Sequence, residues 1–193
     1  MKQDIILAGV GGQGILSIAF VIDKAALKEG FRFKQAEVHG MAQRGGAVQS
    51  HLRLSSDAIF SDLVPKGEAD MILSVEPLET LRYIDYLAQD GVIVTSTSPF
   101  VNIPNYPPIE KVLAKLKAEE RCIMVDAEEL AKEAGISRAQ NMVILGAASP
   151  HLILKEENLR ECIRILFEPK GEKALDMNLR AFQLGRDAAR LKS

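Results

Sequence analysis

The stretch GVGGQG at positions 9–14 constrains the fold of this chain more than any other. It follows the short apolar run DIILA, and it precedes apolar residues at Ile15, Ile18, Ala19, Ile22 and Ala26. Because that spacing places apolar side chains on one face of a helix, the chain begins with a strand, a glycine turn and an amphipathic helix. Gly9, Gly11 and Gly14 have the GxGxxG spacing that lets backbone approach an anion at a helix N-terminus. We therefore expect a Rossmann-like first βα unit.

The rest of the chain alternates short apolar runs with helical patterns. The continuous apolar runs DMILSV, VIVT and CIMV are typical of strands buried on both faces of a parallel sheet. The stretch AVQSHLRL alternates apolar and polar residues, which predicts an antiparallel strand near an edge. We expect a three-layer α/β/α fold with a mostly parallel, mixed sheet, formed by one domain over residues 1–193. Two helices broken at Pro169 and Gly171 would form a helical C-terminal arm.

The segment that opens at Pro77 is expected to be a helix that ends at Asp90 and Gly91. Its inward-facing residues would be Leu78, Leu81, Ile84 and Ala88. Residues 96–108 contain four of the eight prolines, so this stretch is expected to be a loop. Asn141 and Asn178 are expected to be packing residues, with an interface or capping role as the alternative, and His51 a packed or surface histidine.

Composition limits the function classes. Lys and Arg number 24 against 26 Asp and Glu, and this net charge of −2 favours neither nucleic acid nor an anionic membrane as a partner. No apolar stretch approaches the roughly 20 residues that span a bilayer, and the N-terminus has no signal-peptide pattern, so we expect a cytoplasmic location. Cys122 and Cys162 are the only cysteines and have no CxxC spacing, and only three histidines occur. This excludes a cluster or zinc site built on four cysteines, and we expect no metal site.

The glycine turn by itself has three interpretations. It could bind a dinucleotide, with Glu37 at the end of the second predicted strand contacting the ribose. It could bind another anion or a cofactor tail, or its glycines could serve packing alone. The chain offers no obvious nucleophile with a base, and no catalytic pair for hydride chemistry. This weighs against an independent nicotinamide or flavin enzyme.

A second glycine-rich loop, HGMAQRGG at positions 39–46, follows the second predicted strand. Arg44 supplies a cation suited to carboxylate or phosphate, and His39 supplies a titratable group. Ligands of doubly wound folds bind at the carboxyl ends of strands, so we expect this loop beside the glycine turn. His39 and Arg44 are the candidate catalytic residues. The candidates for contact with a ligand or a partner are Gly9, Gly11, Gly12, Gln13, Gly14, Gln43, Gly45 and Gly46.

The stretches GVGGQGIL and EVHGMAQRGGAVQSHLR together resemble the beta subunits of indolepyruvate ferredoxin oxidoreductases, within the gamma-type family of 2-oxoacid:ferredoxin oxidoreductase subunits. NMVILGA and NLRAFQLG extend the resemblance along essentially the whole chain. The version HGMAQRGG favours the arylpyruvate branch over the pyruvate and 2-oxoglutarate branches. The resemblance implies oxidative decarboxylation of arylpyruvates with coenzyme A, giving an aryl-acetyl-CoA, carbon dioxide and reduced ferredoxin.

The resemblance also implies a hetero-oligomer that uses thiamine diphosphate and iron–sulfur clusters. This chain has neither a GDG thiamine motif nor four cysteines, so we expect both cofactors in a larger alpha subunit and no activity of this chain alone. The glycine loops would then contact an anionic substrate or the phosphates of coenzyme A at the subunit interface. Two alternatives stay open. One is a purely structural docking subunit of a pyruvate, 2-oxoisovalerate or 2-oxoglutarate enzyme, and the other is an independent dinucleotide-binding oxidoreductase.

Overall fold

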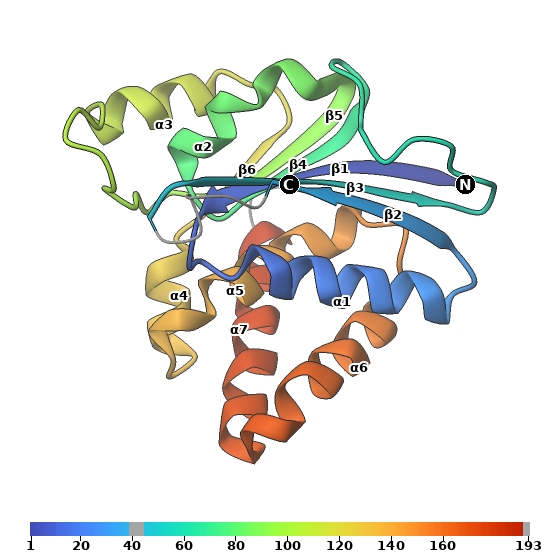
Figure 1. Ribbon diagram of the computed structural model, residues 1–193. Helices are drawn as coiled ribbons and strands as arrows, with labels where there is room; N and C mark the ends of the chain where they lie inside the picture. The colour runs from blue at the N-terminus through green and yellow to red at the C-terminus, as the bar shows by residue number, and fades with distance from the viewer. Residues whose placement is uncertain (39–44, 191–193) are drawn as a thin grey trace.

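The computed structural model describes residues 1–38 and 45–190, and in this part of the chain six strands form one mixed sheet (Figure 1). The strand order is β2-β3-β1-β4-β5-β6. The mutually parallel strands are β1 (Lys2–Val10), β4 (Ala69–Ser74), β5 (Leu87–Ser96) and β6 (Cys122–Val125). The strand β3 (Ala47–Ser55) runs antiparallel to both β1 and β2 (Arg32–Glu37). The expected mixed, mostly parallel sheet is confirmed, with β3 one strand in from the edge.

Helices cover both faces of the sheet, which gives the expected three layers (Figure 1). One layer holds α1 (Ile15–Lys28), α4 (Ala127–Glu133), α5 (Gln140–Ala148), α6 (Glu156–Phe167) and α7 (Glu172–Arg190). The other layer holds α2 (Pro77–Arg82) and α3 (Ile109–Lys117). Short 3-10 turns are η2 (Ile84–Tyr86), η3 (Ser137–Ala139), η4 (Ser149–His151) and η5 (Glu168–Lys170). The α6–α7 hairpin extends away from the sheet as the expected helical arm.

The larger hydrophobic core lies between the sheet and the layer of α1, α5 and α7. Every residue from Asn141 to Ala148 in α5 is buried. A Cβ at Gly146 would lie 1.9 Å from the carbonyl oxygen of Phe182, and a Cβ at Gly185 would lie 1.9 Å from that of Val143. These two glycines therefore allow the backbones of α5 and α7 to touch, which fixes the arm against the body of the domain.

The expected helix over residues 77–90 is wrong beyond the end of α2. The strand β5 already begins at Leu87, because Leu87 pairs with Ala69 of β4. The buried side chains of α2 are Pro77, Glu79 and Thr80, in place of the expected Leu78 and Leu81. Pairing with a distant strand overrides the local helical spacing, which ran on through the start of a strand.

Candidate functional site

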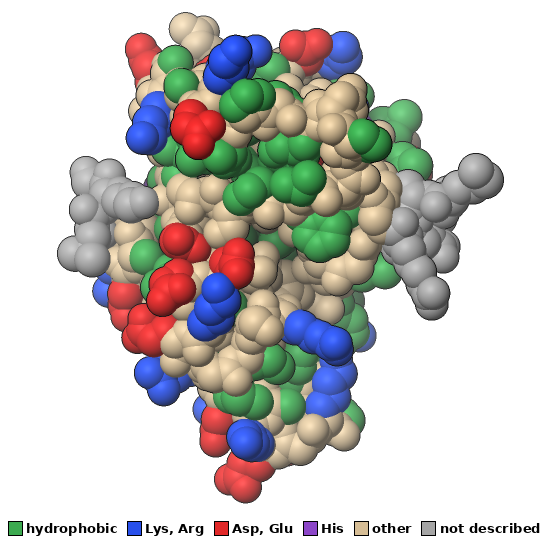
Figure 2. Space-filling model, turned by 90° about the vertical axis from the view of Figure 1, so that its left-hand side faces the viewer, with side chains coloured by type: hydrophobic (Ala, Val, Ile, Leu, Met, Phe, Trp, Pro, Cys, Tyr) green, Lys and Arg blue, Asp and Glu red, His purple; other side chains and the backbone are tan. Residues whose placement is uncertain are grey.

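Loops after β1, β2 and β5 meet at one edge of the sheet. The parallel strands all end there, and β3 begins there because it runs in the opposite direction. Figure 2 shows this edge face-on, with hydrophobic side chains gathered across its upper middle and charged side chains mainly above and below them. Carboxyl ends of strands are where open α/β sheets bind ligands. The described residues of this edge therefore form the candidate site.

The two glycine loops are joined through backbone. The Gly11 N–H donates to the Gly46 carbonyl at 2.8 Å, and the Gly45 N–H donates to the Gly11 carbonyl at 3.2 Å. This pairing prolongs the β1–β3 ladder past its last register pair, Val10 with Ala47. The expected position of the second loop beside the first is confirmed by these bonds. His39, Gln43 and Arg44 lie outside the described residues.

Packing explains Gly9 and Gly14 of the GxGxxG fingerprint. A Cβ at Gly9 would lie 2.8 Å from Ile15 Cδ1. Gly14 has φ +80°, and a Cβ there would lie 2.4 Å from Asn141 Nδ2, which donates to the Gly14 carbonyl at 3.1 Å. Gly12 differs from both, because it has φ +105° and, apart from its chain neighbours, no heavy atom of the described residues would lie within 4 Å of its Cβ. Its backbone faces open space, where a ligand can approach.

The turn ends at α1 with unused backbone donors. The Gln13 side-chain oxygen accepts from Val10 N–H at 2.8 Å, so this side chain closes the turn. Within the described residues no side chain caps α1, and its first turn holds no acidic residue. Uncapped N–H groups and the helix dipole make such an N-terminus favourable for an anion.

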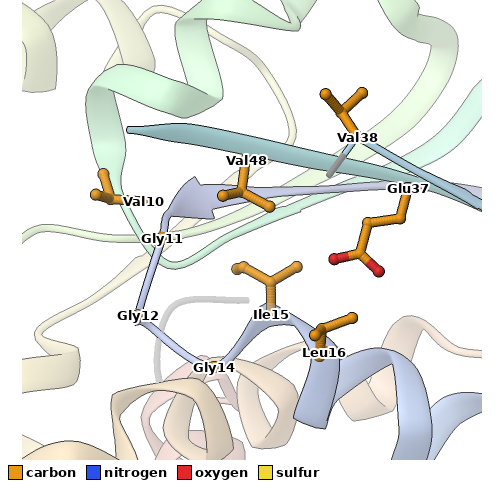
Figure 3. Close-up of a pocket in the computed structure, with 9 residues that line it drawn as sticks. All are labelled: Val10, Gly11, Gly12, Gly14, Ile15, Leu16, Glu37, Val38 and Val48. Atoms are coloured by element: carbon orange, nitrogen blue, oxygen red, sulfur yellow. The ribbon is translucent and has the colours of Figure 1, made fainter. Parts of the chain in front are cut away.

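A cavity of about 440 Å³ lies beside the glycine turn (Figure 3). Its walls are backbone of the glycine turn and the side chains of Val10, Ile15, Leu16, Val38 and Val48. Glu37 directs its carboxylate into this space from the end of β2 (Figure 3). In a dinucleotide-binding Rossmann unit the second strand lies next to the first, whereas here β3 separates β2 from β1. The topology therefore weighs against the ribose contact that the fingerprint suggests.

The third loop, residues 97–108, is irregular as expected, and side chains tie it to its neighbours. Asn102 Nδ2 donates to the Gly45 carbonyl at 2.8 Å. The buried Glu76 carboxylate accepts from Phe100 N–H at 3.3 Å and from the Tyr106 hydroxyl. Burial and this hydrogen bond raise the pKa of Tyr106, so the phenol remains a donor. The sequence predicted none of these anchors, and the capping role of Glu76, whose Oε2 accepts from Glu79 N–H at 2.8 Å, is visible only in the folded chain.

The same edge exposes large apolar side chains around the loops. Leu16 and Val38, at the mouth of the 440 Å³ cavity, are 54% and 51% exposed. Phe100 and Val101 on the third loop are 44% and 69% exposed. An exposed apolar group rimmed by polar residues is typical of a surface that contacts another protein or a ligand.

The described residues contain no set of side chains suited to bind a metal ion. No group of three or more His, Cys, Asp or Glu there could hold a metal ion. Burial raises the pKa of the Cys122 thiol to about 11 and also raises that of Cys162, so both thiols stay protonated at neutral pH. His51 is buried and accepts from Val64 N–H at 3.1 Å, which makes it a packed histidine. Among the described helices, none has the length and apolar character to cross a membrane.

Comparison with known proteins gives consistent matches along the chain. The family model for pyruvate ferredoxin/flavodoxin oxidoreductase matches residues 4–188. The indolepyruvate oxidoreductase subunit IorB of Thermococcus kodakarensis is 41% identical, and the subunit of the same name from Pyrococcus horikoshii is 40% identical; each alignment covers 98% of both chains. The fold is similar to a 2-oxoglutarate:ferredoxin oxidoreductase from Magnetococcus marinus with 2-oxoglutarate, coenzyme A and succinyl-CoA bound. That match has a TM-score of 0.78 and 24% identity, and it covers 98% of this chain and 31% of the other.

Proposed function

The chain belongs to the pyruvate ferredoxin/flavodoxin oxidoreductase family, and from this premise we propose that it is the beta subunit of an indolepyruvate:ferredoxin oxidoreductase. The observation that carries the proposal is the likeness, over nearly the full length of both chains, to subunits named for that enzyme. We further propose that residues 1–193 form a single gamma-type domain and act in the cytoplasm.

The proposed complex oxidatively decarboxylates an arylpyruvate. The bond between the oxo carbon and the carboxylate breaks to release carbon dioxide, and the coenzyme A sulfur forms a bond to the same oxo carbon. The thiol proton leaves and the electrons pass to ferredoxin, which gives an aryl-acetyl-CoA. Thiamine diphosphate supplies the carbanion stabilisation, and iron–sulfur clusters supply the electron path.

The described residues of this chain do not fit either cofactor. A cluster needs four protein ligands, mostly thiolates, whereas Cys122 lies on β6 and the buried Cys162 lies on α6. No step through these groups is therefore assigned to this chain. We propose that a larger alpha subunit binds both cofactors and that ferredoxin meets the complex there.

The glycine loops are the part of this chain proposed to contact a ligand of the complex. Gly12 presents backbone at the open edge, and the N-terminus of α1 favours an anion. These features fit the phosphates of coenzyme A or an anionic substrate at the interface with the alpha subunit. His39, Gln43 and Arg44 are proposed to act on the same ligand, because their loop continues into Gly45.

Reconstitution tests the proposal. The chain is co-expressed with a partner that binds thiamine diphosphate and clusters, and arylpyruvate-dependent viologen reduction is measured. We expect activity in the mixture only, with kcat/KM for indolepyruvate above that for pyruvate or 2-oxoglutarate, and a higher KM for coenzyme A in Arg44→Ala. A partner that turns over indolepyruvate at the full rate alone would disprove the proposal.

A docking role without ligand contact is favoured by one observation, the exposed Phe100 and Val101 on the third loop. In that case Phe100→Ser weakens assembly in size-exclusion chromatography, and substitution of the glycine loops leaves the KM values of the assembled enzyme unchanged. The two roles therefore separate in a single set of variants.

A further inference from the structure

The edge of the sheet opposite the candidate site holds the amino ends of the parallel strands. The loop that joins β3 to β4, residues 56–68, lies at this edge beside the start of β1 (Figure 1). We call it the amino-end loop. It leaves Phe60 94% exposed and Leu63 58% exposed. Phe60 is thereby the most exposed of the large hydrophobic side chains in the described residues.

The amino-end loop is bonded to the sheet although it contains neither helix nor strand. Arg53 on β3 donates to the carbonyls of Ser61 and Leu63, each at 3.2 Å. His51, also on β3, accepts from the N–H of the buried Val64 at 3.1 Å. The backbone next to Phe60 is therefore hydrogen-bonded before any partner binds, which lowers the ordering entropy that association must overcome.

A cavity of about 250 Å³ lies beside the exposed aromatic ring. Ile59 and Phe60 line it from the loop, and Lys2, Asp4 and Arg53 line it from the sheet. Asp4 pairs with Arg53 at 2.8 Å and with Lys2 at 2.9 Å, so these charges already satisfy one another. The projecting ring and the recess beside it thus form a shape that interlocks with another protein surface, without a free charge for an ionic small molecule.

The charge of the amino-end loop is mainly negative. Three of its four charged side chains are acidic, namely Asp57, Asp62 and Glu68. The fourth, Lys66, pairs with Asp85 at 3.2 Å, whereas none of the three acidic side chains forms an ion pair with a described residue. An exposed apolar group rimmed by polar residues is typical of a protein contact, and the rim here calls for a positively charged partner surface.

A second copy of this chain does not supply such a surface through the same loop. In a two-fold symmetric contact each patch meets itself, so Asp57 and Asp62 of one loop would face the same residues of the other. Like charges placed together across an interface oppose association. The chemistry of the loop instead fits an apolar pocket flanked by Lys or Arg on a different protein.

We infer that the amino-end loop docks in such a pocket on the alpha subunit, with Phe60 inserted and Asp57 and Asp62 facing the flanking cations. The inference rests on the proposed function, which supplies the alpha subunit as the partner. The nine residues of β3 separate this contact from the glycine loops by about 30 Å. The chain then meets the alpha subunit at both ends of its sheet, and the contact at the amino end serves assembly alone.

Titration of the full chain with the alpha subunit, followed by sedimentation velocity, measures the dissociation constant of assembly. Phe60→Ser should weaken assembly about tenfold or more, because buried aromatic anchors dominate the energetics of interfaces. Urea denaturation should give the wild-type stability, since the ring is exposed in the chain alone. Asp57→Asn/Asp62→Asn should weaken assembly about threefold and reduce its dependence on salt concentration.

The matched control is Ile165→Ser, which removes another exposed apolar side chain, from α6 in the helical arm. It should leave assembly unchanged, and the assembled Phe60→Ser complex should keep the wild-type KM for coenzyme A. Unchanged assembly of Phe60→Ser, or an equal loss in Ile165→Ser, would overturn the inference. A homodimer of the chain that Phe60→Ser dissociates would assign the loop to a second copy and overturn it as well.

Viologen reduction by the wild-type complex separates this inference from the proposed function. An active wild-type complex whose assembly does not depend on Phe60 would overturn the docking contact and leave the proposed function standing. A wild-type complex that assembles through Phe60 but does not oxidise arylpyruvates would support the docking contact and count against the proposed function.

Discussion

The two loops that flank β3 are fixed in opposite ways. Before β3, Gly45 and Gly46 are held by backbone bonds to Gly11. After β3, side chains supply the central anchors of the loop. Arg53 donates to both carboxylate oxygens of Asp4 at 2.8 and 2.9 Å and to the carbonyls of Ser61 and Leu63, each at 3.2 Å, and His51 accepts from Val64 N–H at 3.1 Å. Asp4 is completely buried.

The loop before β3 lies at the carboxyl end of the parallel strands, and the loop after β3 lies at their amino end. This difference therefore determines which substitutions each end of the sheet can tolerate. A loop held by backbone keeps its shape when side chains change, but an added Cβ can disturb it. A loop held by a charged side chain loses its shape when that side chain is removed. The carboxyl end can therefore vary its side chains for ligands or partners, whereas the loop at the amino end, which exposes 94% of Phe60, depends on Arg53.

The largest effect is expected at the amino end, from Arg53→Met. This variant leaves the buried Asp4 carboxylate with Lys2 as its remaining ion-pair partner and should cost about 3 kcal/mol of unfolding free energy. Urea denaturation measures the loss. The control Lys66→Met removes an exposed ion pair with Asp85 and should cost less than about 1 kcal/mol. Equal losses in the two variants would show that the Arg53 pair does not fix this end.

A substitution of Asp23, on α1, should change stability without altering the loops at either end of the sheet. Burial raises its pKa from 3.8 to about 7, and its Oδ1 has no hydrogen-bond partner among the described residues. The folded state thus retains a proton that the unfolded state releases between these values, so stability falls as pH rises through this window. The full penalty is present above pH 7.

Asp23→Asn should therefore stabilise the chain by about 2 kcal/mol at high pH and have little effect at pH values below the unfolded pKa. Urea denaturation at both pH values measures the difference. We expect unchanged KM values in the assembled complex. A benefit of equal size at both pH values would mean that ionisation of Asp23 is not its cause.

At the carboxyl end, Gly14→Ala has two unfavourable effects. It strains the backbone at φ +80°, and its new Cβ would lie only 2.4 Å from Asn141 Nδ2. We expect a loss of about 2 kcal/mol, measured by urea denaturation. The double variant with Asn141→Ala removes the clash but keeps the strain. Its total loss should be smaller than the sum of the two single losses. Strict additivity would show that the two residues do not meet.

The sequence correctly predicted those features that depend only on residues close together along the chain. Apolar runs identified the buried strands, and GVGGQG placed a glycine turn between β1 and α1. Where strand pairing decided the structure, local spacing failed, as at Leu87, which pairs with Ala69 of β4. The sequence also could not place β3 between β1 and β2, because that order depends on pairing between distant segments.

The candidate site divides in the same way. The meeting of Gly11 with Gly45 followed from the rule that carboxyl ends of strands share an edge. The link from Asn102 to Gly45 did not, because it joins segments far apart in sequence. Single polar residues in loops carry no periodic signal, so only the folded chain reveals what they face.

The smallest effect, and the most direct test of the difference between the two ends, comes from a matched pair of glycines. Gly45 has φ +75° at the carboxyl end and Gly67 has φ +77° at the amino end, and apart from chain neighbours no heavy atom of the described residues would lie within 4 Å of either Cβ. Gly45→Ala and Gly67→Ala should each cost about 1 kcal/mol, because alanine is strained in this region. Only Gly45→Ala should raise the KM for coenzyme A in the assembled complex, by several-fold. Since the stability losses match, a KM change confined to Gly45→Ala assigns ligand contact to the carboxyl end, and equal changes in both variants would contradict it.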